Sequence, residues 1–139
     1  MNGAVAIVLA AGSGERFQGS LPKALVPVAG RSMVVRAVER ARECAAIGSV
    51  VVVAPLGFEG EVREGLSDVV VVTGGSSRHE SVRCGLDAVP DEAPAVVCHD
   101  AARALATTGL FDRVLAALDG WDGVVPVVPV VDTVKRVSG

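Results

Sequence analysis

The stretch AVAIVLAAGSGER occupies residues 4–16, and the tetrapeptide PKAL follows at residues 22–25. Residues 4–9, AVAIVL, form a continuous apolar run, which is typical of a strand buried in a parallel sheet. Small residues come next, and they let a backbone approach a phosphate chain closely. Arg16 and Lys23 add cations that can offset the charge that develops when a phosphorus centre is attacked. The stretch therefore predicts a strand that leads into a nucleoside-triphosphate site.

Two other phosphate-binding loops do not fit this stretch. A P-loop needs a Lys-Ser or Lys-Thr pair, and the sequence contains neither. A dinucleotide-binding loop needs a third glycine three residues after Gly14, where this chain has Phe17. An ordinary turn would explain Gly12 and Gly14 alone, but the cations that follow them favour nucleotide transfer.

Length and composition describe one domain with a sizeable apolar core. The chain has 139 residues, half of them hydrophobic, and a net charge of −3. Its basic residues are scattered and its aromatic residues are few, which argues against a nucleic-acid partner. We expect no membrane span, because no apolar stretch approaches ~18 residues. The three cysteines lack metal-ligand spacing and no charged leader opens the chain, so a cytoplasmic location is expected.

Short β-branched runs alternate with helical patterns along the chain, which predicts an α/β fold. The expected architecture is a Rossmann-like, mostly parallel sheet with helices on both faces. Strands are expected at residues 4–9, 49–53, 69–73, 95–99 and 123–128, and an extended segment at 23–28. Helices are expected at residues 32–45, 59–66, 78–89 and 108–118.

Three motifs follow predicted parallel strands, at residues 10–16, 74–81 and 100–103. In open α/β sheets the ligand crevice lies beyond the carboxyl ends of the strands. The three motifs should therefore converge on one crevice.

The motif at residues 74–81 could bind a nucleoside. Gly74 and Gly75 leave room for a base or ribose, and Ser81 offers a hydroxyl for a hydrogen bond. The same residues also fit a plain strand–turn–helix joint capped by Ser76 or Ser77. Arg78 is expected to support this loop rather than to bind phosphate.

The motif at residues 100–103 could bind phosphate groups, directly or through a metal ion. The Asp100 carboxylate suits Mg²⁺, which commonly binds substrate phosphates and keeps several waters. Arg103 can make a bidentate contact with the phosphate of an acceptor molecule. The residues alone also allow a loop-capping role for Asp100 and a surface ion pair for Arg103. We interpret His99 as a strand-end residue and not as a general base, because an attacking phosphate is already an anion.

Five sequence blocks together resemble the 2-C-methyl-D-erythritol 4-phosphate cytidylyltransferase family of the non-mevalonate isoprenoid pathway. They are LAAGSGER (residues 9–16), PKAL (22–25), GGSSRHESV (74–82), HDAAR (99–103) and DTVKR (132–136). The first block is shared with other sugar and polyol nucleotidyltransferases, while the combination is more specific. The resemblance implies a nucleotidyltransferase fold and transfer of CMP from CTP to the polyol phosphate, with release of pyrophosphate. It also implies a homodimer.

The resemblance carries residue roles with it. Arg16 and Lys23 would be catalytic. Asp100 would hold Mg²⁺ or another divalent cation and would also bind the acceptor. Arg103 and Thr133 would bind the acceptor, Thr133 in the partner's site. The nucleotide-binding residues would be Leu9, Ala10, Ala11, Gly12, Gly14, Gly75, Ser76, Ser81 and Ala101. The family usually has proline where this chain has Ala104.

The resemblance divides the chain into a nucleotide-binding domain at residues 1–129 and the start of a dimerisation β-arm at 130–139. Family members continue beyond this arm and supply a further catalytic lysine, so the activity of these 139 residues alone is open. Two alternatives also stay open. One is a ribitol 5-phosphate cytidylyltransferase. The other is a truncated, non-catalytic module that binds CTP or dimerises.

Overall fold

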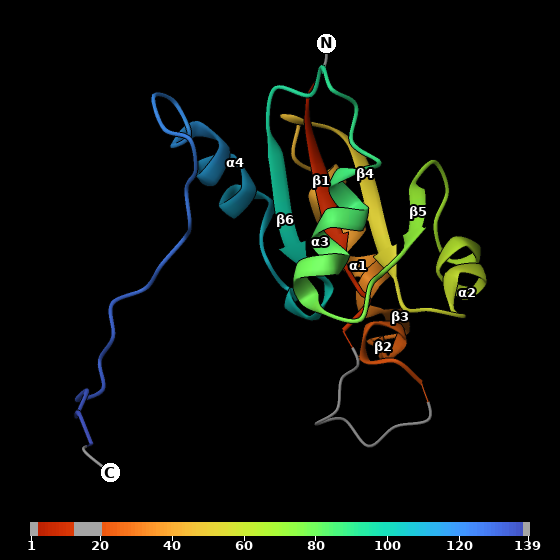
Figure 1. The fold of residues 1–139 in the computed structure, drawn as a ribbon, viewed down its shortest axis with the longest axis horizontal. Coiled ribbons are helices and arrows are strands. Elements are labelled where there is room, and N and C mark those ends of the chain that lie inside the picture. The colour runs from red at the N-terminus through yellow and green to blue at the C-terminus, as the bar shows by residue number, and fades with distance from the viewer. Residues whose placement is uncertain (1–2, 13–20, 138–139) are drawn as a thin grey trace.

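The computed structural model of the protein describes residues 3–12 and 21–137. Its centre is a sheet of four parallel strands in the order β5-β4-β1-β6 (Figure 1). The strands are β1 (Ala4–Leu9), β4 (Ile47–Ala54), β5 (Val70–Thr73) and β6 (Val96–Asp100). The predicted parallel α/β sheet is thus confirmed, with each of these strands within about three residues of its expected bounds.

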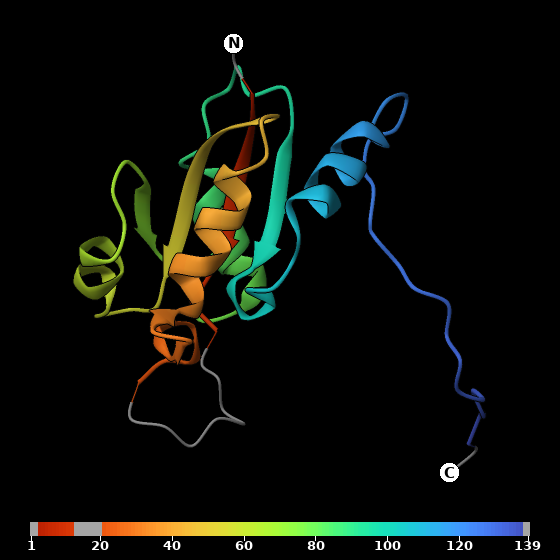
Figure 2. The ribbon, with the colours of Figure 1, turned by 180° about the vertical axis from the view of Figure 1, so that it is seen from behind.

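Helices cover both faces of the sheet, as expected. α3 lies on the face that Figure 1 presents, and α1 lies on the opposite face, which Figure 2 presents. The helices are α1 (Met33–Arg42), α2 (Glu59–Glu64), α3 (Arg78–Leu86) and α4 (Thr108–Ala116). Two short 3-10 turns, η1 (Lys23–Leu25) and η2 (Ala101–Arg103), lie near the carboxyl edge of the sheet.

The core consists of one apolar layer on each face of the sheet. Val8 and Val52 belong to the layer beneath α1, and Ile7 and Val53 belong to the layer on the opposite face, beneath α3. All four side chains are fully buried. α3 approaches this second layer closely because it carries Gly85, where a Cβ atom would stand 2.6 Å from Cγ2 of Ile7.

Serine caps fix where the two main helices begin. The Ser32 hydroxyl accepts a hydrogen bond from the backbone of Val35, and the Ser77 hydroxyl accepts one from the backbone of Glu80. These contacts satisfy N–H groups that have no partner inside a helix. Both helices begin where the sequence predicted, although each ends about three residues early, at Arg42 and Leu86.

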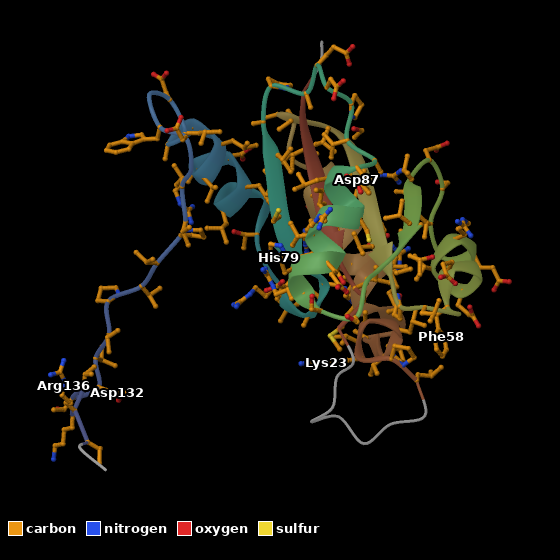
Figure 3. The ribbon with its side chains drawn as sticks, in the orientation of Figure 1. Lys23, Phe58, His79, Asp87, Asp132 and Arg136 are labelled. Atoms are coloured by element: carbon orange, nitrogen blue, oxygen red, sulfur yellow. The ribbon has the colours of Figure 1, made fainter. Side chains whose placement is uncertain are left out.

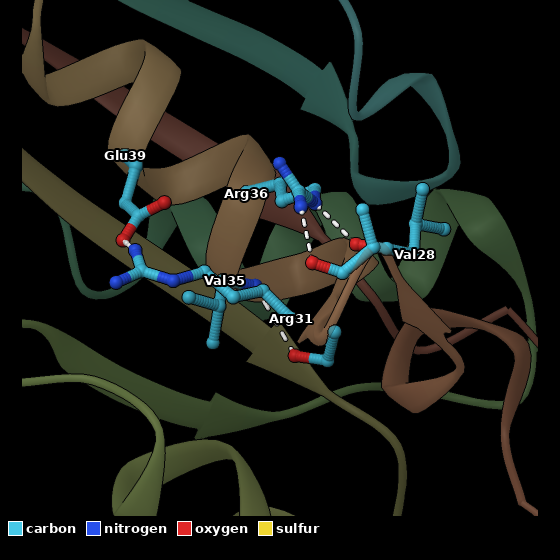
Figure 4. A network of polar contacts seen from close by, with 7 residues as sticks. Val28, Arg31, Val35, Arg36 and Glu39 are labelled. Carbon is cyan, nitrogen blue, oxygen red and sulfur yellow. Dashed lines mark hydrogen bonds and ion pairs between the residues drawn. The ribbon is translucent and has the colours of Figure 1, made fainter.

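The extended segment expected at residues 23–28 is wrong in its first half. The backbone N–H of Leu25 donates to the carbonyl of Pro22, which closes the η1 turn. The second half pairs as β2 (Pro27–Val28) with β3 (Arg31–Ser32), across a turn with positive φ angles. Arg36 of α1 donates to the carbonyls of Val28 and Ala29 and so ties this hairpin to the helix (Figure 4).

The strand expected at residues 123–128 is also wrong. Residues 123–137 form no helix or strand, and this segment runs away from the sheet (Figures 1 and 2). Val125, Val127 and Val128 are about 80 % exposed, at 78 %, 85 % and 84 %. Without a neighbouring strand the peptide groups have no partners, and the two prolines lack an N–H altogether. The β-arm expected at 130–139 likewise forms no strand in its described residues.

The described helices are short, and the longest, α1, has ten residues. None of those in the described ranges is long and apolar enough to cross a membrane. Cys44, Cys84 and Cys98 are free thiols.

Candidate active site

The strand order places a crevice at one point of the sheet edge. From β1 the chain adds β4 and then β5 on one side and returns to add β6 on the other. The direction of winding therefore reverses beside β1, which is where open α/β sheets bind ligands. Leu9 and Asp100 are partners at the last register position of β1 and β6. A cavity of about 1230 Å³ lies at this edge.

The three predicted motifs converge on this cavity. Each site residue predicted within 9–12, at Lys23, within 74–81 and within 100–103 contributes to its lining. The predicted residues Gly14 and Arg16 lie outside the described residues. Thr133 belongs to the segment that runs away from the sheet, and its neighbours Asp132 and Arg136 lie far from Lys23 in Figure 3. The fold thus brings together all the described site residues except Thr133.

Hydrogen bonds within the 74–81 motif hold its loop in place. The buried Ser81 hydroxyl accepts from the backbone N–H of Gly75 at 3.2 Å and donates to the carbonyl of Ser77 at 2.9 Å. The hydroxyl that was expected to meet a nucleoside is therefore occupied within the loop. The cap expected at Ser76 or Ser77 is Ser77. The motif therefore both joins β5 to the capped start of α3 and lines the cavity.

Glu80 is a further part of this loop that the sequence interpretation missed. Its Oε2 accepts from the backbone N–H of Ser76 at 2.7 Å and from the Ser76 hydroxyl at 2.6 Å. These hydrogen bonds lower the pKa of Glu80 below its usual value. The signal was present in the sequence, because Ser77 followed three residues later by Glu80 has the spacing of a capping box.

Asp100 lies between two arginines. Its Oδ1 accepts from Nη2 of Arg78 at 3.1 Å, and its Oδ2 accepts from Nε of Arg103 at 3.3 Å. Arg78 is the first residue of α3 and Arg103 ends η2, so the two cations come from different elements. Arg78 was expected to support the 74–77 loop; its guanidinium instead contacts Asp100.

The donor set around Asp100 fits a cation shared with a ligand rather than one held by protein alone. Among the described residues, no three His, Cys, Asp or Glu side chains gather closely enough to hold a metal ion. Asp100 nevertheless offers a hard oxygen donor inside the cavity. Mg²⁺ is typically bound in this way, through one or two carboxylates together with substrate phosphates.

His99 is packed in the core beside the site. Its side chain is buried, and its ring lies edge-on to Phe111 of α4 at 5.1 Å between centroids. Burial lowers the pKa of His99 below its usual value, so the neutral ring is favoured. Among the described residues its Nε2 has no hydrogen-bond partner. This placement agrees with a strand-end residue.

The parallel sheet and its glycine-rich, cation-bearing crevice define an α/β domain of the nucleotidyltransferase type. The sequence model of the family described as 2-C-methyl-D-erythritol 4-phosphate cytidylyltransferase matches residues 4–139. The chain belongs to this family.

Individual relatives agree with this family. The chain is 49 % identical over 135 residues to the 2-C-methyl-D-erythritol 4-phosphate cytidylyltransferase of Frankia casuarinae. This match covers 96 % of the chain and 51 % of that relative. The Streptomyces coelicolor enzyme of the same name is 45 % identical, with 96 % and 53 % covered. The crystal structure of the Thermus thermophilus enzyme matches with a TM-score of 0.72 at 30 % identity and covers 96 % of this chain and 58 % of that one. The chain therefore spans about half the length of the curated relatives it matches.

Proposed function

We propose that the protein is a cytidylyltransferase that transfers CMP from CTP to 2-C-methyl-D-erythritol 4-phosphate and releases pyrophosphate. One observation carries the proposal. The family motifs within residues 9–12, 22–25, 74–81 and 100–103 line a single cavity at the point where the winding of the sheet reverses. The names of the relatives supply the base and the acceptor.

In this proposal CTP lies along the carboxyl edge of the sheet. The loop at residues 9–12 and Gly75, Ser76 and Ala101 contact the nucleotide, and Lys23 reaches its phosphates. Lys23 lines the cavity and is exposed there, which leaves its ammonium available to an anion. Arg16 and Gly14 lie outside the described residues, so their roles rest on the sequence motif and on the resemblance. Ser81 acts through the loop, since its hydroxyl already bonds Gly75 and Ser77.

The reaction is an in-line displacement at phosphorus. An oxygen of the acceptor's phosphate forms a bond to the α-phosphorus, and the bond from that phosphorus to the oxygen bridging to the β-phosphorus breaks. The electron pair of that bond leaves with pyrophosphate. Because the attacking oxygen is already anionic, no general base is needed. Lys23 and Arg16 stabilise the added charge on the phosphoryl oxygens. Asp100 would hold Mg²⁺, which supplies charge neutralisation on the triphosphate.

Arg103 and Thr133 bind the phosphate of the acceptor in this proposal. Arg103 lines the cavity, whereas Thr133 belongs to the segment that leaves its own sheet. We therefore propose a homodimer in which Thr133 reaches the partner's cavity. The apolar side chains of this segment support the dimer, because Val130, Val131 and Val134 are all more than 70 % exposed in the single chain, at 74 %, 93 % and 85 %. A cytoplasmic location is supported by the three free thiols.

The test is pyrophosphate release from the purified protein with Mg²⁺ and CTP. 2-C-methyl-D-erythritol 4-phosphate and ribitol 5-phosphate are supplied in separate reactions, and sedimentation gives the oligomeric state. Release with the erythritol substrate alone supports the proposal. Release with ribitol 5-phosphate alone would mean that the acceptor is ribitol 5-phosphate and not 2-C-methyl-D-erythritol 4-phosphate. CTP binding without release from either acceptor would overturn the catalytic proposal and leave a nucleotide-binding module.

A further inference from the structure

Two guanidinium groups hold the two oxygens of Asp100 separately. Arg78 donates to Oδ1 and Arg103 donates to Oδ2, at 3.1 and 3.3 Å. Arg103 is only three residues from Asp100 along the chain, but Arg78 comes from the start of α3, twenty-two residues away. The Arg78 contact therefore joins the wall of the cavity that carries the 74–77 loop to the wall that carries the carboxylate.

The two arginines are not equivalent once ligands enter. The proposed function assigns Arg103 to the phosphate of the acceptor. A bidentate contact of that phosphate with Nε and one Nη of Arg103 takes the atom that now donates to Oδ2, so this hydrogen bond to Asp100 is given up. Arg78 then remains as the contact that fixes the carboxylate. Because it holds Oδ1, the oxygen that becomes available to a cation is Oδ2. A single carboxylate oxygen suits an ion that takes its remaining ligands from phosphates and water.

We infer that Arg78 is a positioning residue that orients Asp100 for the divalent cation bound with the nucleotide. The inference rests on the proposed function, which gives Asp100 its cation and Arg103 its phosphate.

A purely structural role explains the Arg78 contact less well. The side chains of Arg78 and Asp100 are 66 % and 34 % exposed, and ion pairs this accessible add little to folding stability. The 74–77 loop has its own supports, since Ser77, Ser81 and Glu80 hold it through hydrogen bonds. Replacing the Arg78 side chain should therefore leave the fold and the loop in place.

The experiment measures the affinity for α,β-methylene-CTP, which cannot release pyrophosphate, by calorimetry with saturating 2-C-methyl-D-erythritol 4-phosphate, once with Mg²⁺ and once with EDTA. The ratio of the two dissociation constants is the Mg²⁺ enhancement of binding. The variants are Arg78→Met, Arg78→Lys, Asp100→Asn and the double variant Arg78→Met/Asp100→Asn. The matched control is Arg83→Met, an exposed arginine on the same helix that is not among the described cavity-lining residues.

Arg78→Met is expected to reduce the Mg²⁺ enhancement at least fivefold, while the dissociation constant in EDTA changes by less than threefold. Arg78→Lys should recover part of the enhancement, and Arg83→Met should keep all of it. In the Asp100→Asn background, Arg78→Met should have no further effect, because Arg78 acts through that carboxylate.

Three results would overturn the inference. An equal loss of affinity with and without Mg²⁺ would mean that Arg78 shapes the nucleotide loop. A loss in EDTA that persists in the Asp100→Asn background would mean that Arg78 binds the triphosphate directly. An unchanged enhancement in Arg78→Met, alongside normal pyrophosphate release, would remove the positioning role while leaving the proposed function intact. If the unmodified protein shows no enhancement and no pyrophosphate release, the proposed function itself fails.

Discussion

Gly74 and Ala11 touch across the crevice so closely that a Cβ atom on Gly74 would stand 2.2 Å from the Cβ of Ala11. The two loops meet because both are anchored to the end of β4. The backbone N–H of Ala10 donates to Val53, and that of Gly74 donates to Ala54, each at 2.9 Å. Ala11 and Gly74 therefore cannot move apart without breaking the sheet edge.

Gly74→Ala is expected to displace one of these loops. Forcing a methyl group into this space should lower the free energy of unfolding by ~1–3 kcal/mol, and it should weaken CTP binding because both loops line the cavity. Urea denaturation and calorimetry measure the two effects. The control is Gly60→Ala in α2, where an added Cβ meets nothing within 4 Å and should stabilise the helix slightly. If both variants behave alike, the contact between the loops does not restrict them.

Lys23→Ala should act on the rate of the reaction rather than on nucleotide affinity. Removing one preorganised donor to a developing charge typically lowers kcat by ~10²–10³. We expect a loss of this size, with a smaller rise in the KM for CTP. Initial rates of pyrophosphate release give both constants. Arg31→Ala, at an exposed arginine paired with Glu39 (Figure 4), is the control. An unchanged kcat with a raised KM would refute a transition-state role.

Ser77→Ala tests the cap of α3. The variant loses the hydroxyl that accepts from the Glu80 backbone, which should lower the free energy of unfolding by ~0.5–2 kcal/mol. CTP binding should weaken as well, because the cap begins the helix that carries Ser81. Ser67→Ala, at an exposed loop serine, is the control. A stability equal to that of this control would show that the cap contributes nothing.

His99 should make folding stability depend on pH. Burial holds the pKa of His99 below its ordinary value of 6.5, so the unfolded chain binds this proton more readily than the folded chain does. The contribution of His99 is therefore fully present above about pH 6.5 and is lost as the pH falls below that value. His99→Leu should show a smaller loss of melting temperature between pH 7.5 and 5.5 than the unmodified protein. His79→Gln, at an exposed histidine, is the control, and equal pH dependence in all three proteins would contradict the prediction.

Much of the site could be predicted from the sequence because its residues follow strands directly. A strand that precedes Ala10, Gly74 or Ala101 fixes the edge of the sheet on which each of them lies. The roles of all the predicted site residues remain predictions. Arg16 lies outside the described residues, and Thr133 is not among the described residues that line the cavity. The strand predicted at residues 123–128 was wrong. A valine-rich run indicates that a segment is apolar enough to be buried in a sheet, but it does not show that a neighbouring strand is present to pair with it.

The sequence by itself determined the alternation of strands and helices, the serine caps and the grouping of the motifs at one edge. These depend on local backbone preference and on the spacing of apolar residues, which a chain carries without reference to its distant parts. Only the tertiary structure decided that Gly74 meets Ala11 and that Arg78 reaches Asp100. Both contacts join residues far apart in the chain, and they exist only because the parallel strands bring their carboxyl ends together.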